Sequence, residues 1–335
     1  MNRKSLLKIC LVLVVFTACK KKVETPPVTT VEPINGVDYR HEMRQFIVHL
    51  AQYARQFNSD FIVIPQNGQQ LCTVNGNADG PLAIDYLATI NGQGREELFF
   101  GYDGNDDEAT PAIERDMWLP FLDRMRDAEV KILVTDYCSD PFLVQNSYVM
   151  NGQSSFISFA ADARDLNTIP SYPTAPYGVN SANVINLGDA KNFLYLINTD
   201  QFNDKASLIA AMIATNYDLI IMDAFFEDES YSATEIAQLK LKANGGTRRV
   251  VAYMSIGEAE DYRYYWLPFW SFNAPDWMGA LNPDWPGNFK VQYWNGEWQQ
   301  IIYGNNDSYT KKIIDSGFDG VYLDIIDAFE FWEEQ

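Results

Sequence analysis

Short apolar runs of four or five residues recur along the chain, separated by longer segments that mix polar and apolar positions. A run of this length between turn residues is typical of a strand buried on both faces, as in a parallel sheet. The pattern predicts strands at 61–64, 86–89, 131–135, 156–159, 193–197, 219–222, 250–254 and 320–323.

Between these runs, apolar residues recur at the spacing of an amphipathic helix. The spacing predicts helices over residues 41–56, 117–127, 206–215, 233–243 and 309–316. Strands that alternate with helices in this way predict an α/β fold, a (β/α)8 TIM barrel. Residues 165–189 interrupt the alternation, and their Pro, Asn, Ser and Tyr content predicts a long connecting loop.

The first residues follow a different pattern. A short apolar segment, 6–16, comes after a charged start and is too short to span a bilayer as an ordinary helix. It ends in Phe16-Thr-Ala-Cys19, which resembles a bacterial lipobox. We therefore expect a signal peptide at 1–18, lipidation of Cys19 and a Lys-, Pro- and Thr-rich tether at 19–36. An ordinary secretory signal cut nearby is the alternative.

These features predict a protein anchored by lipid in the bacterial cell envelope, in the periplasm or at the cell surface, with residues 37–335 as one domain. The net charge of −20 argues against nucleic acid as a partner. The charge is compatible with a cationic substrate or with a simple role in solubility. Export permits a disulfide between Cys72 and Cys138, but we do not expect one.

Acidic residues stand directly after several predicted strands. Asp136, Asp223 and Asp324 each end an apolar run, and Glu258 and Arg263 follow the run at 250–254. The active sites of parallel barrels lie at the carboxyl ends of the strands, so these positions are candidates for catalysis. An acid at the same place can instead cap the following helix or join a salt bridge.

Several longer motifs stand out, at residues 253–266, Trp285-Pro-Gly287, Tyr293-Trp294, Trp298 and residues 317–327. Together they resemble glycoside hydrolase family 114, the endo-α-1,4-polygalactosaminidase-like proteins. Blocks that follow the Leu323-Asp-Ile-Ile-Asp327 block in the family precede it here, at 61–68, 92–100 and 134–137. The resemblance therefore implies a circularly permuted barrel, in which family strands 5–8 come first and strands 1–4 follow. A closed barrel tolerates such a change because the ends of a domain often lie close together.

The resemblance also implies the roles of particular residues. Asp324 matches a catalytic carboxylate of the family, and Glu96 matches the catalytic acid, followed by Glu97. Glycoside hydrolysis usually needs two such carboxyls. We expect Asp324 to stay ionised as the nucleophile and Glu96 to have a raised pKa. The residues expected to bind substrate or to orient the pair are Asn67, Asp136, Asp223, Tyr253, Glu258, Arg263 and Asp327.

An aromatic-rich stretch runs from Trp266 to Trp298. Aromatic faces stack on sugar rings, so this region is either a sugar platform or a loop folded over its own aromatic core. The only histidines, His41 and His49, lie on a predicted helix, away from the strand ends. This placement argues against a Ser-His-Asp triad and against a His-ligated zinc site, and no metal or cofactor is expected.

The resemblance thus implies an endo-acting glycoside hydrolase that cuts an α-1,4-linked galactosamine-type polysaccharide, such as a cationic amino-sugar polymer. The alternative is a non-catalytic glycan-binding surface lipoprotein on the same barrel.

Overall fold

The computed structural model describes residues 36–335. The predicted signal peptide, the lipidation site Cys19 and nearly all of the predicted tether lie outside the described residues. Within residues 36–335, no helix has both the length and the apolar character needed to cross a membrane.

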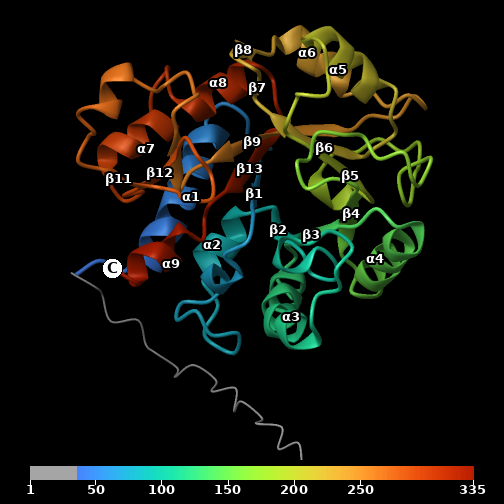
Figure 1. Cartoon of the computed structure of the whole chain (residues 1–335), viewed down its shortest axis with the longest axis horizontal. Helices are drawn as coiled ribbons and strands as arrows, with labels where there is room; N and C mark the ends of the chain where they lie inside the picture. Colours follow the sequence, from blue (N-terminus) through green and yellow to red (C-terminus); the bar gives the residue numbers. More distant parts are fainter. Residues whose placement is uncertain (1–35) are drawn as a thin grey trace, which may run out of the picture. The chain divides into compact units, whose positions relative to one another are not determined.

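Parallel strands form the centre of the fold (Figure 1). A five-stranded sheet has the order β1-β13-β9-β6-β5, and a three-stranded sheet has the order β2-β3-β4; all these pairs are parallel. The bounds are β1 Ile62–Pro65, β2 Gly92–Glu96, β3 Lys131–Tyr137, β4 Ile157–Ala161, β5 Phe193–Leu196, β6 Leu219–Asp223, β9 Arg249–Ser255 and β13 Gly320–Asp324.

The two parallel sheets meet at an isolated parallel bridge between Gln66 and Gly94, where Asn67 N–H donates to the Gly94 carbonyl at 2.9 Å. At the other side, β4 contacts β5. Each parallel strand therefore lies beside the parallel strand that follows it in the sequence, and the last one, β13, lies beside the first, β1. The predicted α/β class and its parallel sheet are confirmed.

One predicted strand is wrong. Residues 86–89 lie in helix α2 (Ile84–Thr89), and the strand of this region is β2, whose Gly-Gln-Gly-Arg-Glu sequence carries no apolar side chain. The strand is defined by its parallel backbone pairing with β3, and its second glycine, Gly94, is needed for packing. A Cβ on Gly94 would stand 2.1 Å from the Tyr322 hydroxyl, so only glycine leaves room for that buried ring. Every other predicted strand overlaps an observed one.

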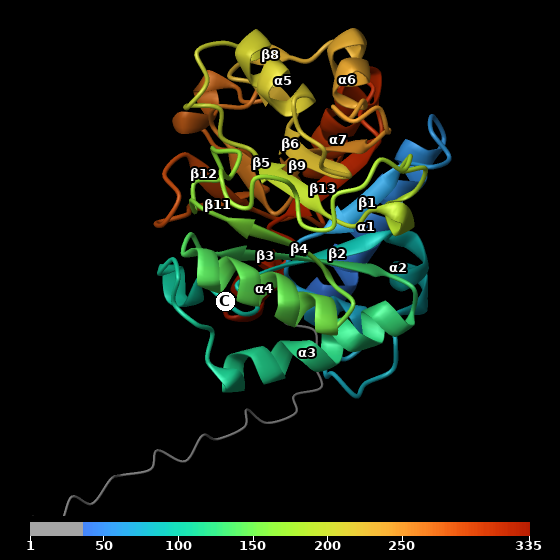
Figure 2. The same cartoon turned by 90° about the vertical axis from the view of Figure 1, so that its right-hand side faces the viewer.

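Helices lie on the outer side of the strands, and Figure 2 shows α3 and α4 beneath the β2–β4 sheet. The helix bounds are α1 Tyr39–Arg55, α2 Ile84–Thr89, α3 Ala112–Asp127, α4 Pro141–Gln153, α5 Lys205–Ile213, α6 Ala233–Leu239, α7 Gly296–Ile302, α8 Tyr309–Asp315 and α9 Ala328–Glu333. All five predicted helices are present in whole or part. The sequence analysis missed α4, because exposed Phe142 and Val149 break its one-sided apolar pattern. It also missed α7, a short helix.

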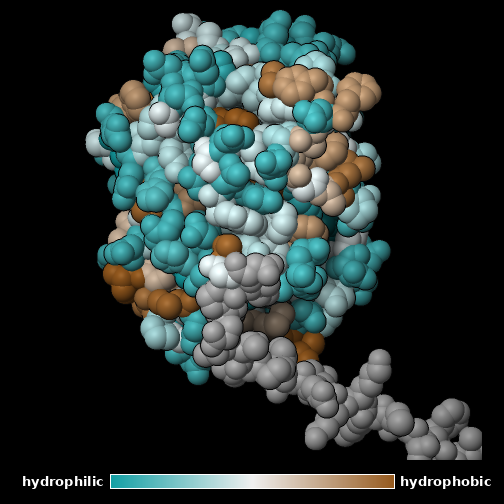
Figure 3. Space-filling model, turned by 90° about the vertical axis from the view of Figure 1, so that its left-hand side faces the viewer, coloured by the Kyte–Doolittle hydropathy of each residue, from teal (hydrophilic) through white to brown (hydrophobic). Residues whose placement is uncertain are grey.

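Short antiparallel strands leave the carboxyl ends of β6 and β9. They are β7 Phe225–Phe226, β8 Glu229–Ser230, β10 Glu258–Glu260, β11 Met278–Leu281 and β12 Asn288–Val291. Most of the aromatic-rich stretch packs here as a core: Trp277 and Trp298 are buried, and Trp266 stacks on Phe289. Trp285 is exposed. Figure 3 shows the side of the molecule that carries this region, where hydrophobic residues are scattered among hydrophilic ones.

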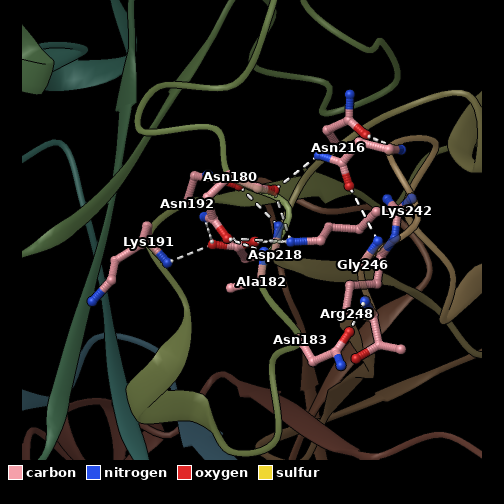
Figure 4. Close-up of polar contacts among 12 residues, drawn as sticks. Asn180, Ala182, Asn183, Lys191, Asn192, Asn216, Asp218, Lys242, Gly246 and Arg248 are labelled. Atoms are coloured by element: carbon pink, nitrogen blue, oxygen red, sulfur yellow. Dashed lines mark hydrogen bonds and ion pairs between the residues drawn. The ribbon is translucent and has the colours of Figure 1, made fainter.

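The amino-terminal edge of β6 holds a buried ion pair. Asp218 contacts the Lys242 ammonium at 2.8 Å, and both side chains are fully buried. The other carboxylate oxygen accepts hydrogen bonds from the Asn180 side chain and from the Lys191 N–H, each at 2.9 Å (Figure 4). These contacts fasten the end of the predicted long loop and the approach to β5 against the sheet.

Helices α1 and α9, from opposite ends of the described residues, pack together. Arg40 forms a two-pronged ion pair with Glu333, with N–O distances of 2.8 and 2.9 Å, and its guanidinium lies 4.8 Å from the Phe329 ring centre. Cys72 and Cys138 are both free and buried, so they do not pair.

Candidate active site

The carboxyl ends of β1, β2 and β13 lie side by side, and each is followed by a sharp turn. Asn67, Glu97 and Ile325 all have left-handed backbones, with φ of 59°, 56° and 57°. This conformation costs about 1–3 kcal/mol for a residue other than glycine, and most for a β-branched residue such as Ile325. Two of the turns begin directly after Glu96 and Asp324. A residue with a left-handed backbone thus directly follows each of the two predicted catalytic carboxyls.

Side chains from β1 and β3 fix the Glu96 carboxylate. One oxygen accepts from the Gln66 amide at 2.5 Å and from the Asn67 amide at 3.0 Å, and the other accepts from the Tyr137 hydroxyl. The Tyr195 hydroxyl donates to the Gln66 carbonyl oxygen at 2.8 Å, which turns the amide nitrogen of Gln66 toward Glu96. All three donors to Glu96 are neutral, so they orient this carboxylate without cancelling its charge.

Asp324 is held from β9. Its carboxylate accepts from the Tyr253 hydroxyl at 2.6 Å and from the Ile325 N–H at 2.8 Å. Burial, and then the nearby charge of Glu96, raise the pKa of Asp324 to about 7. From the sequence we expected Asp324 to stay ionised and the raised pKa to belong to Glu96. In the structure, burial gives a physical reason for a raised pKa at Asp324. The effect of Glu96 on this pKa also shows that the two carboxyls lie close enough to interact.

A cavity of about 350 Å³ opens beside Glu96. Its lining residues are mostly polar and come from the ends of β1, β2 and β13 and from α3 and α9. They are Asn67, Gly68, Gln69, Gln70, Arg95, Glu96, Glu97, Trp118, Asp327 and Glu330. Burial, followed by the charge of Glu330, raises the pKa of Asp327 to about 7. Arg95 is the one basic residue in this lining, and its guanidinium lies 4.5 Å from the Trp118 ring centre.

Asp223 and Arg263 are brought together at the carboxyl end of β6. The Arg263 fork contacts both Asp223 oxygens at 2.8 Å, and its Nε contacts Glu260 at 2.7 Å. Glu260 also accepts from the Tyr262 hydroxyl at 2.6 Å. This network sets one guanidinium against two carboxylates and lies outside the residues that line the cavity.

Two further predicted residues are fully buried and brace loops. Asp136 accepts the N–H groups of Phe99 and Phe100 and the Ser147 hydroxyl, which ties the loop after β2 to β3 and α4. Glu258 contacts Lys290 at 2.5 Å within the β10–β12 sheet. Neither lines the cavity.

Of the predicted residues, Asn67, Glu96 and Asp327 line the cavity, and Tyr253 holds Asp324 next to it. Gln66, Tyr137 and Tyr195, which orient Glu96, were not among the predicted site residues. A weak signal was present, because Gln66 and Tyr137 each stand two residues after the end of a predicted strand. Among residues 36–335, no group of three or more His, Cys, Asp or Glu side chains has an arrangement suited to a metal ion.

Comparison with known proteins supports the family resemblance for the second part of the chain. Residues 184–335 match the model of glycoside-hydrolase family GH114. This part includes Asp324 and Tyr253, whereas Glu96 lies outside the match.

The curated relatives are uncharacterized proteins. One from Methanocaldococcus jannaschii is 42% identical over 158 residues, which cover 46% of this chain and 43% of that protein. One from Thermotoga maritima is 46% identical over 109 residues, covering 32% and 31%. One from Deinococcus radiodurans is 40% identical over 120 residues, covering 36% of each. The chain thus spans less than half the length of each of these relatives.

Proposed function

We propose that this chain, whose residues 184–335 match the model of glycoside-hydrolase family GH114, hydrolyses glycosidic bonds with the carboxyl pair of Asp324 and Glu96. The observation that carries the proposal is the arrangement of these carboxyls. They stand at the ends of nearby parallel strands, are oriented by neutral donors and adjoin a polar cavity. A barrel hydrolase places its reactive groups in the same way.

In the proposed reaction, one carboxyl protonates the leaving glycosidic oxygen. The other attacks the anomeric carbon or removes a proton from the attacking water. The family resemblance assigns the acid to Glu96, while burial and then the charge of Glu96 raise the pKa of Asp324 to about 7. A substrate with an activated leaving group separates the roles, because it needs no acid. Of the two variants Asp324→Asn and Glu96→Gln, the one that still cleaves this substrate lacks the general acid. The one that no longer cleaves it lacks the nucleophile or general base.

The proposed substrate is an α-1,4-linked galactosamine-type polysaccharide, cut internally. The family resemblance supports this choice. Glu97, Asp327 and Glu330 add to it, because a cavity wall with several carboxyls suits a sugar that carries a free amine. Equal affinity for a neutral polymer of the same linkage would contradict this substrate.

The test of the function is oligosaccharide release from a panel of polysaccharides, including partly de-N-acetylated galactosaminogalactan. We expect release by the wild-type protein and loss in Asp324→Asn and in Glu96→Gln. Asp85→Asn and Glu108→Gln, at exposed positions, are the matched controls. No release by the wild type, with binding retained in all variants, would instead favour the non-catalytic glycan-binding lipoprotein.

We also propose that the two parallel sheets close into one circularly permuted (β/α)8 barrel. The bridge between Gln66 and Gly94, the contact of β4 with β5 and the consecutive strand order support closure. The family match begins at residue 184, after β1–β4, which supports the permutation. A rearranged chain, with residues 184–335 joined by a short linker to residues 37–165, should melt cooperatively and keep its activity. Loss of cooperative melting would contradict this topology.

Finally, we propose that Cys19 carries a lipid that anchors the protein in the bacterial cell envelope, where its partner is a polysaccharide and not a nucleic acid. The apolar segment before Cys19 and the net charge of −20 support this placement. Cys19→Ser should move the protein from the membrane fraction to the soluble fraction. Unchanged fractionation would contradict lipid anchoring.

A further inference from the structure

Arg164 stands in the loop that follows β4, and its side chain contacts the loop that follows β2. Its Nη1 lies 2.5 Å from an oxygen of Glu97, and its Nη2 donates to the Gly101 carbonyl at 2.8 Å. Its Nε lies 3.3 Å from an oxygen of Asp106. Three contacts from one planar group thus fix the guanidinium at the carboxyl ends of β2 and β4.

The same guanidinium lies over the ring of Tyr137 at the end of β3, with its central carbon 4.1 Å from the ring centre. The Tyr137 hydroxyl donates to the Glu96 carboxylate. A cation at this distance from an aromatic face is attracted to the ring and holds it in place. Arg164 therefore touches the residue that orients one of the two proposed catalytic carboxyls, without touching that carboxyl itself.

The charge of Arg164 also acts on the Tyr137 hydroxyl. Burial, and then the charge of Glu96, raise the pKa of Tyr137, and the positive charge of Arg164 acts in the opposite direction. A phenol that is polarised by a nearby cation donates a stronger hydrogen bond. The position of Arg164 thus favours a firm hydrogen bond from Tyr137 to Glu96.

The loop after β2 does not depend on Arg164 for its attachment. Asp136 accepts two backbone N–H groups of this loop, and the Thr110 hydroxyl donates to the Glu97 carbonyl at 2.8 Å. The Arg164 side chain is 31% exposed, and a partly exposed ion pair contributes little to stability. We therefore expect the loop to stay in place when the guanidinium is removed.

We propose that Arg164 is a positioning residue of the reaction, which acts on Glu96 through Tyr137. The contacts with Glu97, Gly101 and Asp106 hold the guanidinium over the ring, and the ring carries its effect to the carboxylate. The inference rests on the proposed function and adds to it a residue that was not among the predicted site residues. Because Arg164 does not line the cavity beside Glu96, its loss should change kcat and leave KM unaltered.

The test is a double-mutant cycle on the full chain, with kcat and KM measured for oligosaccharide release. We expect Arg164→Met to lower kcat about tenfold, since a hydrogen bond to a charged group contributes roughly that much. In a chain that already carries Tyr137→Phe, the same change should have little further effect. Phenylalanine keeps the ring beneath the guanidinium but has no hydroxyl through which Arg164 can act.

Two further variants complete the experiment. Arg164→Lys keeps the positive charge and should recover part of the lost kcat. Arg115→Met removes an arginine that pairs with the neighbouring Asp116 on α3, and this matched control should leave kcat unchanged. If Arg164→Met does not melt cooperatively, Arg164→Gln, which is neutral and polar, replaces it in the cycle.

The possible results separate this inference from the proposed function. An unchanged kcat in the neutral variants, or the same loss with and without the Tyr137 hydroxyl, would overturn the positioning role and leave the hydrolase proposal standing. A rise in KM alone would overturn it as well, because it would mean that Arg164 binds substrate. Failure of the wild-type protein to release oligosaccharides from any polymer would overturn the proposed function together with this inference.

Discussion

The acidic residues just before β6 and β13 and the two predicted catalytic carboxyls at the other end of the strands have partners of opposite kinds. At the amino-terminal edge, Asp218 pairs with Lys242, and Asp319 contacts both Lys240 and Arg249 at 2.9 Å. At the carboxyl-terminal edge, Glu96 and Asp324 receive hydrogen bonds only from uncharged groups within residues 36–335. The first arrangement stabilises the fold. The second keeps carboxyls oriented and reactive, at the cost of burial and mutual repulsion.

Removing a carboxyl at the reactive edge should give the largest effect. Asp324→Asn or Glu96→Gln should lower oligosaccharide release by about 10²–10⁴-fold, the usual contribution of a positioned acid or base. The melting temperature should stay the same or rise, because a buried charge and its repulsion are removed. Loss of activity that is explained by unfolding of the variant would contradict the view that these carboxyls do not stabilise the fold.

Breaking the ion pair at the opposite edge should reverse this outcome. Lys242→Met leaves Asp218 charged and buried, so the free energy of unfolding should fall by about 3–5 kcal/mol in urea titrations. Activity per folded molecule should not change. Lys311→Met removes a partly exposed pair with Asp315 and should cost about 0–1 kcal/mol. Equal losses in the two variants would contradict the role given to the buried pair.

The pH dependence of stability should sharpen the comparison. The pKa of Asp324 is near 7 in the folded protein and near 4 in an unfolded chain, so the folded state holds more protons between these values. Its contribution is therefore present below about pH 4 and is lost as the pH rises through 7. Unfolding free energies between pH 5 and 8 should decline less steeply in Asp324→Asn than in the wild type. The same slope in both proteins would contradict the raised pKa.

The smallest effect should come from the orienting hydroxyl. Tyr253→Phe removes a hydrogen bond that favours the ionised form of Asp324, so its pKa should rise further. We expect kcat to fall about tenfold and the pH–rate profile to shift to higher pH, since a hydrogen bond to a charged group contributes about 1.5–3 kcal/mol. A lower kcat with an unchanged profile would mean that Tyr253 only packs against the site.

Periodicity predicted most of the fold because apolar strands and one-sided helices leave a clear pattern. It failed at β2, where the strand depends on pairing with β3 and on the room that Gly94 leaves for Tyr322. Such a strand has no apolar signal of its own, and the competing helix at 84–89 supplied one.

The site was predictable only in part. Asp324 follows from the end of a predicted strand and from the family resemblance, whereas Glu96 follows from the resemblance alone. Their partners Gln66, Tyr137 and Tyr195 depend on which strands adjoin and in what register, and that information is absent from local sequence. Asp136, like Asp324, directly follows a predicted strand. Only the structure shows that Asp136 accepts the Phe99 and Phe100 N–H groups and so holds a loop in place.

The pairing of β1 with β13 has a consequence for the making of the protein. Glu96 is synthesised early and Asp324 more than two hundred residues later, so the emerging chain holds half of the site while the ribosome is still working. Strand contacts this distant in sequence form slowly. If the proposed pair is the catalytic one, a nascent chain therefore has no activity until these two remote segments meet.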